Sequence, residues 1–299
     1  MIVRIFNSKN GGFMNILNLV EKFFLGEYRA SNLNSFRLYG TSNENINGYL
    51  DFFNLTNRSL CTIGSSFDHS INASFKNPRS ITIVDKCPFT EYYSYLKLAA
   101  FLELHRMDYA YFICKKDCNQ YLDINKKFML KETFERIKNT LRLCDYDSYC
   151  IWEEIFCRYN QPQINSLFRD DVTYLENVIR CNCYLLSDVN YLLARKSVLN
   201  TPISIIIADI NDFGFNIGSN VVWLSNVFDY LKNDEIIFKR IVNGLSNGGE
   251  VLYRYYWEED FIVADKLRMY ALEFDTKCYN IVGARSCGNG DDFVLIYTK

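Results

Sequence analysis

Five short apolar segments, separated by stretches with helical spacing, constrain this chain more than any other feature. The segments are 59–63, 80–84, 203–208, 220–224 and 250–254. The apolar core of each is nearly continuous, which is typical of strands buried on both faces of a parallel sheet. The sequence therefore predicts an α/β protein built on a mainly parallel sheet.

The last part of the sequence predicts a different kind of pairing. Two apolar segments, 279–283 and 293–297, are separated by the glycine-containing stretch 286–292. Strands joined in this way are expected to pair antiparallel. With the five earlier strands, they complete a mainly parallel seven-stranded sheet that ends in an antiparallel hairpin.

Helical spacing of apolar residues fills the regions before and between the strands. The expected helical segments are 13–30, 44–54, 88–104, a set of helices within 105–170, and one long helix over 171–198. We expect residues 1–58 to form an N-terminal helical cap. Residues 59–299 should form one Rossmann-like domain, with a helical insertion or cap at about 105–198.

Composition favours a folded globular protein and argues against several classes. The chain is 49% hydrophobic and 23% charged, with 33 Lys and Arg against 35 Asp and Glu and no basic block. The N-terminus lacks the apolar region of a signal peptide, and no run approaches the ~18 apolar residues of a spanning helix. We expect a cytoplasmic protein with no nucleic-acid partner, and no pattern indicates the oligomeric state.

The 11 cysteines are expected to be reduced thiols, because they are scattered and odd in number. The closest spacings are Cys114 with Cys118 and Cys181 with Cys183, and neither is a C-x-x-C pair. A zinc site is therefore not expected.

The loop after the first predicted strand is a candidate cofactor-binding site. Ligands of open α/β sheets lie beyond the carboxyl ends of the strands. Here the chain has Gly64, Ser65 and Ser66, small residues that allow a sharp turn and a close approach of backbone N–H groups. The next two residues each have two possible roles. Asp68 is expected to contact the cofactor or to cap the following helix, and His69 to act as a general base or to be a solvated side chain.

Polar residues also follow the next strands. Asp85, 21 residues after the glycine of that loop, is expected to accept hydrogen bonds from ribose hydroxyls, or else to cap the following helix. After the third strand, Asp209, with Ile210 beside it, should contact an adenine ring or begin a turn. After the fourth, Ser225 and Asn226 should face the reacting end of a cofactor.

This strand order and these positions resemble the class I S-adenosylmethionine-dependent transferases. Within that class, the sequences 62–72, 83–85, 95–100, 224–231 and 248–254 resemble the betaine-lipid-synthase type of 3-amino-3-carboxypropyltransferases and their relatives. The resemblance implies a Rossmann-like methyltransferase fold and S-adenosylmethionine as cofactor. It also implies transfer of a methyl or 3-amino-3-carboxypropyl group to a small-molecule or lipid acceptor.

The same resemblance implies catalytic roles near the substrate for Asp229 and Arg254. His69 is the third catalytic candidate, proposed from its imidazole side chain and not from the resemblance. A structural ion pair between Asp229 and Arg254 is the other possibility, because a buried arginine must be paired. Two other functions stay open. The single glycine of the loop fits a protein that binds the cofactor without transfer, and a nicotinamide-dependent oxidoreductase would need a G-x-G-x-x-G motif, which is missing here.

Overall fold

The computed structural model describes most of the chain at the level of secondary structure. The described residues are 12–27, 37–52, 54–64, 66–115, 127–169, 174–211, 219–225, 227, 234–255, 278–285 and 291–299. Within these ranges, the side chains of 12–15, 253–255, 278–285 and 291–295 are not described.

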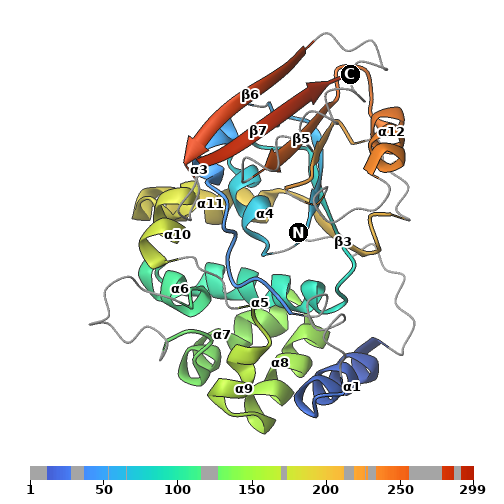
Figure 1. Ribbon diagram of the computed structural model, residues 1–299. Helices are drawn as coiled ribbons and strands as arrows, with labels where there is room; N and C mark the ends of the chain where they lie inside the picture. The colour runs from blue at the N-terminus through green and yellow to red at the C-terminus, as the bar shows by residue number, and fades with distance from the viewer. Residues whose placement is uncertain are drawn as a thin grey trace.

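A seven-stranded sheet with the order β3-β2-β1-β4-β5-β7-β6 forms the centre of the described structure (Figure 1). Its strands are β1 (Ser59–Ile63), β2 (Ser80–Asp85), β3 (Ile203–Ile207), β4 (Val221–Trp223), β5 (Glu250–Tyr255), β6 (Cys278–Arg285) and β7 (Asp291–Thr298). The first five are parallel, and β7 pairs antiparallel with both β5 and β6. The predicted parallel sheet with an antiparallel C-terminal hairpin is confirmed.

Register places the ends of the central strands side by side. Leu60 of β1 pairs with Ile81 of β2 and with Val221 of β4, so β1 lies between these two strands. The strand order reverses between β1 and β4, and such a switch point leaves a crevice beyond the carboxyl ends of the two strands. The loops after β1 and β4 therefore meet at this edge.

The two faces of the sheet are covered by different helices, as expected for continuously apolar strands. On one face, Cys61, Val84, Val222 and Val251 pack with α12 (Asp234–Gly244). The opposite face carries the larger core, which is shared with α4 (Asp68–Ser74), α5 (Phe89–Glu103) and α11 (Asp188–Asn200).

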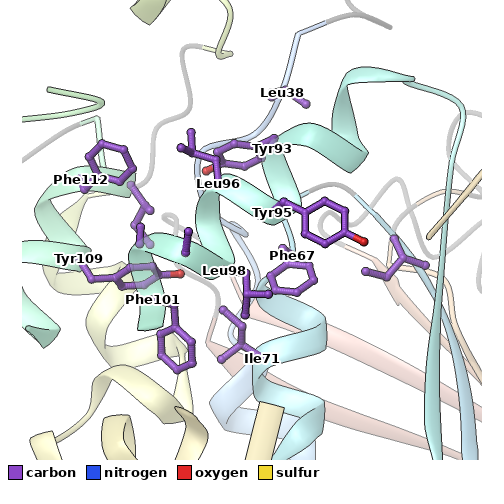
Figure 2. Packing of buried hydrophobic residues seen from close by; sticks show 14 of the residues in the cluster. Leu38, Phe67, Ile71, Tyr93, Tyr95, Leu96, Leu98, Phe101, Tyr109 and Phe112 are labelled. Carbon is purple, nitrogen blue, oxygen red and sulfur yellow. The ribbon is translucent and has the colours of Figure 1, made fainter. Parts of the chain in front are cut away.

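A layer of helices extends this larger core away from the sheet (Figure 1). Its members are α1 (Gly12–Phe24), α6 (Arg106–Ile113), α7 (Lys131–Cys144), α8 (Tyr146–Arg158) and α9 (Gln161–Ser166), and α5 contacts both α7 and α8. Phe67, Ile71 of α4, Leu98 and Phe101 of α5, and Tyr109 of α6 illustrate how this layer packs against the helices of the sheet (Figure 2).

A short N-terminal segment joins the sheet to this layer. It holds α3 (Ile46–Tyr49) and the 3-10 helix η1 (Leu50–Phe52), where the sequence predicts one helix. Tyr49 is buried against Trp223 of β4, with ring centroids 5.6 Å apart. Residues 37–52 therefore share the core of the larger face.

The prediction of one long helix over 171–198 is wrong. The chain instead forms α10 (Leu175–Cys181), the 3-10 helix η3 (Cys183–Leu185) and α11. Asn182 breaks the helix because its side chain bonds both Asn72 and the carbonyl of Val178, and Ser187 caps α11 by accepting from Asn190 N. The expected apolar stripe splits as well. Leu175, Val178 and Leu185 are buried, whereas Leu186, Val189 and Leu192 are exposed.

No helix in the described ranges combines the length and the apolar character that crossing a membrane requires.

Candidate functional site at the carboxyl ends of the strands

Gly64 ends β1 in very close contact with β2. A Cβ atom at this position would lie 2.6 Å from Ile83 Cγ2 and 3.0 Å from both Asp85 Cβ and Thr90 Cγ2. Because no larger residue fits there, the loop after β1 starts directly beside the Asp85 side chain. Two residues predicted to hold a cofactor are thus brought together.

We expect Gly64→Ala to test this contact. The added methyl group should separate β1 from Asp85 and cost about 1–3 kcal/mol of stability, as overpacking usually does. Urea unfolding measures the loss. Gly26→Ala is the control. Gly26 has φ +71° with open space around it, so the stability lost in this variant should come from backbone strain alone. Equal stability of Gly64→Ala and the unmodified chain would contradict the account of this contact.

The turn into α4 uses a left-handed residue that is not glycine. Phe67 has φ 67° and precedes the first residue of α4, with its ring buried among Tyr95 and Leu98 of α5 (Figure 2). Ser225, directly beyond β4, is also left-handed, with φ 53°. Such conformations cost about 1–3 kcal/mol in non-glycine residues and cluster at functional sites. Here they lie on the two loops that flank the switch point.

Asp68 is fully buried and engaged on both carboxylate oxygens. Oδ1 accepts from Tyr184 OH at 2.6 Å and lies 2.8 Å from Lys97 Nζ. Oδ2 accepts from Ser42 N at 2.7 Å and from Ser66 Oγ at 3.0 Å. A carboxylate has about four acceptor positions, so protein donors fill those of Asp68. Its side chain therefore ties α4 to α5, to η3 and to residue 42.

Lys97 is the cation that balances this carboxylate. Its ammonium group is fully buried in α5 and also donates to the carbonyl of Gly40 at 3.0 Å, as does Tyr93 OH at 2.6 Å. Burial lowers the pKa of Lys97, and the Asp68 charge opposes that shift. Gly40 and Ser42 are thus held against the loop after β1 by the same ion pair.

Glu44 places a second buried carboxylate at the switch point itself. Its Oε2 accepts from Tyr49 OH and from His69 Nε2, the latter at 3.1 Å, and its Oε1 accepts from Ser225 Oγ. The residue is 1% exposed. Glu44 therefore joins the loop after β1 to the loop after β4.

His69 is positioned by two contacts. Besides the Glu44 bond, its ring stands edge-on to Trp223 of β4, with centroids 4.4 Å apart. Its Nδ1 atom is buried without a hydrogen-bond partner among the described residues. One interpretation of the sequence places His69 as a solvated side chain in the loop. His69 is instead a buried, packed member of α4.

Asp85 stands half-buried at the end of β2, on the other side of Gly64. Oδ1 accepts from Cys87 N at 2.8 Å, so the carboxylate also shapes the turn before α5. Burial raises the pKa of Asp85, although hydrogen bonds from Cys87 and Thr90 and the charges of Lys86 and Arg169 work in the opposite direction. The side chain is thus oriented by its own turn.

Arg169 adds a positive charge and an aromatic neighbour near Asp85. Its guanidinium group lies over the Tyr39 ring, 4.4 Å from the centroid, and donates to Tyr39 OH. Its charge acts on Asp85. Arg169 and Tyr39 come from distant parts of the chain, and no sequence pattern singled them out.

Asp209 follows β3 and begins a turn. This turn is one of the two roles that the sequence predicts for Asp209, the other being contact with an adenine ring. Its Oδ1 accepts from Asn211 N at 2.9 Å and from Asn211 Nδ2 at 2.6 Å. Ile210 is buried in the core on the α12 face of the sheet. The Asp209 carboxylate is partly exposed, beyond the strand that pairs with β2.

Several predicted site residues lie outside the described structure. They are Ser65, Asn226 and Asp229, together with the side chain of Arg254, whose backbone belongs to β5. The predicted pairing of Asp229 with Arg254 therefore stays a prediction.

Thiols and acidic groups of the described residues form no metal centre. No group of three or more His, Cys, Asp or Glu side chains in these ranges is placed to hold an ion. Burial raises the pKa of Cys61 to about 12 and that of Cys87 to about 11, with the Asp85 charge adding to the second shift. These thiols are therefore protonated at neutral pH.

A pocket of about 530 Å³ lies elsewhere, among α7, α8 and α9. Its walls include Leu130, Phe156, Tyr159 and Ile164. No residue of the predicted cofactor site lines it. The pocket therefore lies apart from the carboxyl ends of the strands, where α/β sheets bind their ligands.

Glu44 and Lys97 are two buried charged side chains at the candidate site that the sequence analysis did not single out, in addition to Arg169 and Tyr39. Lys97 had a usable signal, because it interrupts the apolar run 95–100 of an otherwise buried helix. A buried lysine requires a carboxylate partner. Glu44 had no comparable signal, since it lies in a polar stretch far from the strands.

The strand order is that of a mixed α/β, Rossmann-like methyltransferase fold. No family model matches the chain, and no curated protein matches its sequence.

Several solved methyltransferases resemble the chain at a distance. The N-methyltransferase NodS from Bradyrhizobium japonicum WM9 is 9% identical, with 97% of this chain and 98% of that chain covered and a TM-score of 0.37. A SAM-dependent methyltransferase from Aquifex aeolicus is 6% identical, with 94% and 97% covered and a TM-score of 0.40. A putative S-adenosyl-L-methionine-dependent methyltransferase from Methanococcus maripaludis is 11% identical, with 98% and 96% covered and a TM-score of 0.40. These likenesses are too distant to carry an assignment, so the class of fold rests on the strand order.

Proposed function

We propose that this protein is an S-adenosylmethionine-dependent transferase whose cofactor lies beyond the carboxyl ends of β1 to β4. The observation that carries the proposal is the switch point between β1 and β4. Gly64 and Asp85 adjoin there on one side, and Ser225 and Glu44 on the other. Ligands of open α/β sheets bind at such points.

Each part of the edge suits one part of this cofactor. The Asp85 carboxylate can accept hydrogen bonds from two ribose hydroxyls, and Asp209, beyond the next strand, can accept from the adenine amino group. The loop after β1 offers backbone N–H groups near the start of α4. His69 and Glu44 then face the reacting end. Phe67 and Ser225 are two of the five non-glycine residues with positive φ in the described part of the chain, and both lie on the loops involved.

Transfer from a sulfonium needs mainly alignment of the acceptor with the carbon that is attacked. The acceptor's nucleophile forms a bond to that carbon, the carbon–sulfur bond breaks, and its electron pair stays on sulfur. Attack on the methyl carbon leaves S-adenosylhomocysteine. Attack on the 3-amino-3-carboxypropyl group leaves 5′-methylthioadenosine. The acceptor is a small molecule or a lipid.

Mass spectrometry of the sulfur product tests the proposal. The purified full chain is incubated with S-adenosylmethionine and a cell extract that supplies acceptors, with a boiled sample as control. We expect protein-dependent accumulation of one of the two products, and its identity fixes the carbon attacked. Absence of both products above the boiled control would remove the support for transfer.

A second function is favoured by one observation. The carboxylate oxygens of Glu44 already have partners within the protein, in Tyr49, His69 and Ser225. A protein that binds the cofactor without transferring a group would not need these oxygens for an acceptor. Saturable binding in calorimetry, with no product from any extract, would favour this second function over the transferase.

A further inference from the structure

An apolar stripe runs along the outer side of α11 and the residue before its cap. Of the large hydrophobic side chains that the described residues leave exposed, five lie between residues 186 and 199. They are 44% to 65% exposed: Leu186, Val189, Leu192, Leu193 and Leu199. Single exposed apolar residues are ordinary, whereas a contiguous patch marks an interaction site.

The helix that carries the stripe is firmly anchored to the rest of the protein. The opposite side of α11 is firmly packed, with Tyr191, Ala194 and Val198 buried and α4 and η3 in contact. Tyr191 OH donates to the carbonyl of Phe101 at 3.1 Å, and Arg195 Nε donates to the same oxygen at 2.6 Å. The helix lies at the flank of the molecule beside α10 (Figure 1). The stripe is therefore a fixed, outward-facing surface.

Charges of opposite sign lie four residues before and four residues after Leu192. Asp188 begins α11 with an 81% exposed side chain that also bonds Arg106, and Lys196 is exposed about two turns later. If a second α11 lies antiparallel across Leu192, Asp188 of each helix meets Lys196 of the other and the two Leu192 side chains meet at the centre. The helix dipoles are then opposed as well. A parallel arrangement would instead bring like charges together.

From this self-complementarity we propose that α11 is the contact surface of a symmetric homodimer. One surface pairing with itself is the usual form of a twofold interface. A helix of 13 residues is about 20 Å long, so the contact is smaller than the ~800 Å² per partner of a standard interface. The dimer is consequently weak, with a dissociation constant in the micromolar range. The proposal is independent of the transferase function.

Sedimentation velocity of the full chain tests the proposal, from about 1 to about 300 µM, a range that brackets micromolar dissociation constants. We expect a monomer–dimer equilibrium. Leu192→Glu should raise the dissociation constant about a hundredfold or more, because it places two carboxylates at the centre of the contact. Leu143→Glu is the matched control: Leu143 is 89% exposed on α7, and its replacement should leave the equilibrium unchanged.

Charge reversal tests the antiparallel orientation. Lys196→Asp alone should weaken the dimer at least several-fold, and the double variant Asp188→Lys, Lys196→Asp should restore it. Asp188 also bonds Arg106 at the surface, and loss of an exposed pair has little effect on folding. Circular dichroism confirms that each variant is folded.

Three results would overturn the proposal. One is a wild-type chain that stays monomeric at every concentration. Another is a dimer whose dissociation constant is unchanged in Leu192→Glu, or is raised as much by Leu143→Glu as by Leu192→Glu. The third is a monomer that sediments with phosphatidylcholine vesicles through Leu192, which would make the stripe a lipid-docking surface.

Discussion

Replacing Lys97 by methionine should remove about 3–5 kcal/mol of the free energy of unfolding, the usual cost of breaking a buried ion pair from one side. The substitution roughly keeps the volume of the side chain but leaves the buried Asp68 side chain without its cation. It also removes the donor to Gly40, so residues 40–42 lose one of their anchors. Urea unfolding monitored by circular dichroism measures the change.

Two further variants separate the ion pair from simple packing. Asp68→Asn combined with Lys97→Met removes both charges and should recover a large part of the lost stability, because no uncompensated charge remains. Lys138→Met is the surface control: Lys138 pairs with Glu135 in the solvent, where an ion pair contributes little. If Lys97→Met were no more destabilising than Lys138→Met, the Asp68–Lys97 pair could not be what holds this edge together.

Replacing Asp85 by asparagine should separate stability from cofactor binding. We expect affinity for S-adenosylmethionine to fall about a hundredfold, because hydrogen bonds to a charged acceptor contribute about 1.5–3 kcal/mol and asparagine has no charge and only one acceptor oxygen for the two ribose hydroxyls. Calorimetric titration measures the affinity. Asp51→Asn, at an 83% exposed position, is the control and should bind as the unmodified chain does.

Although Asp85→Asn should bind S-adenosylmethionine more weakly, its free energy of unfolding should not be lower than that of the unmodified chain. Burial raises the pKa of Asp85 in the folded chain above its ordinary value. The folded state therefore binds a proton more tightly than the unfolded state, and stability decreases as the pH rises through this pKa. At neutral pH the ionised carboxylate opposes folding, so asparagine should leave the free energy of unfolding equal or higher. A clear loss of stability would assign Asp85 to the fold instead of the ligand.

The same shift predicts a pH dependence of binding. As the pH falls toward the raised pKa, Asp85 becomes protonated and loses part of its capacity to accept hydrogen bonds. Affinity for S-adenosylmethionine should decline at a higher pH than an ordinary carboxyl group would give, and this decline should be missing in Asp85→Asn. Parallel pH profiles for the two proteins would contradict the assignment.

Local patterns were enough to predict the sheet and part of the site. Strands buried on both faces have continuous apolar sequences, so β1, β2 and β3 could be located within a residue or two. Once they are parallel, the residues after them must share an edge. This is why Gly64 and Asp85, 21 positions apart, were expected near one another and lie in contact.

Long-range partners could not be predicted in this way. Glu44 reaches His69 and Ser225 only because residues 40–45 cross the end of the sheet, and no periodicity encodes that path. The break at Asn182 had a similar origin, because its side chain bonds Asn72 of a helix 110 residues earlier. Tertiary hydrogen bonds there overrode a helical pattern that was locally sound.

Calorimetric titration of the full-length chain with S-adenosylmethionine, S-adenosylhomocysteine and NADH tests the cofactor assignment most directly. We expect one saturable site per chain for the two adenosyl-sulfur compounds and no measurable heat with NADH. A folded chain that fails to bind S-adenosylmethionine, or that binds NADH more tightly, would contradict the assignment.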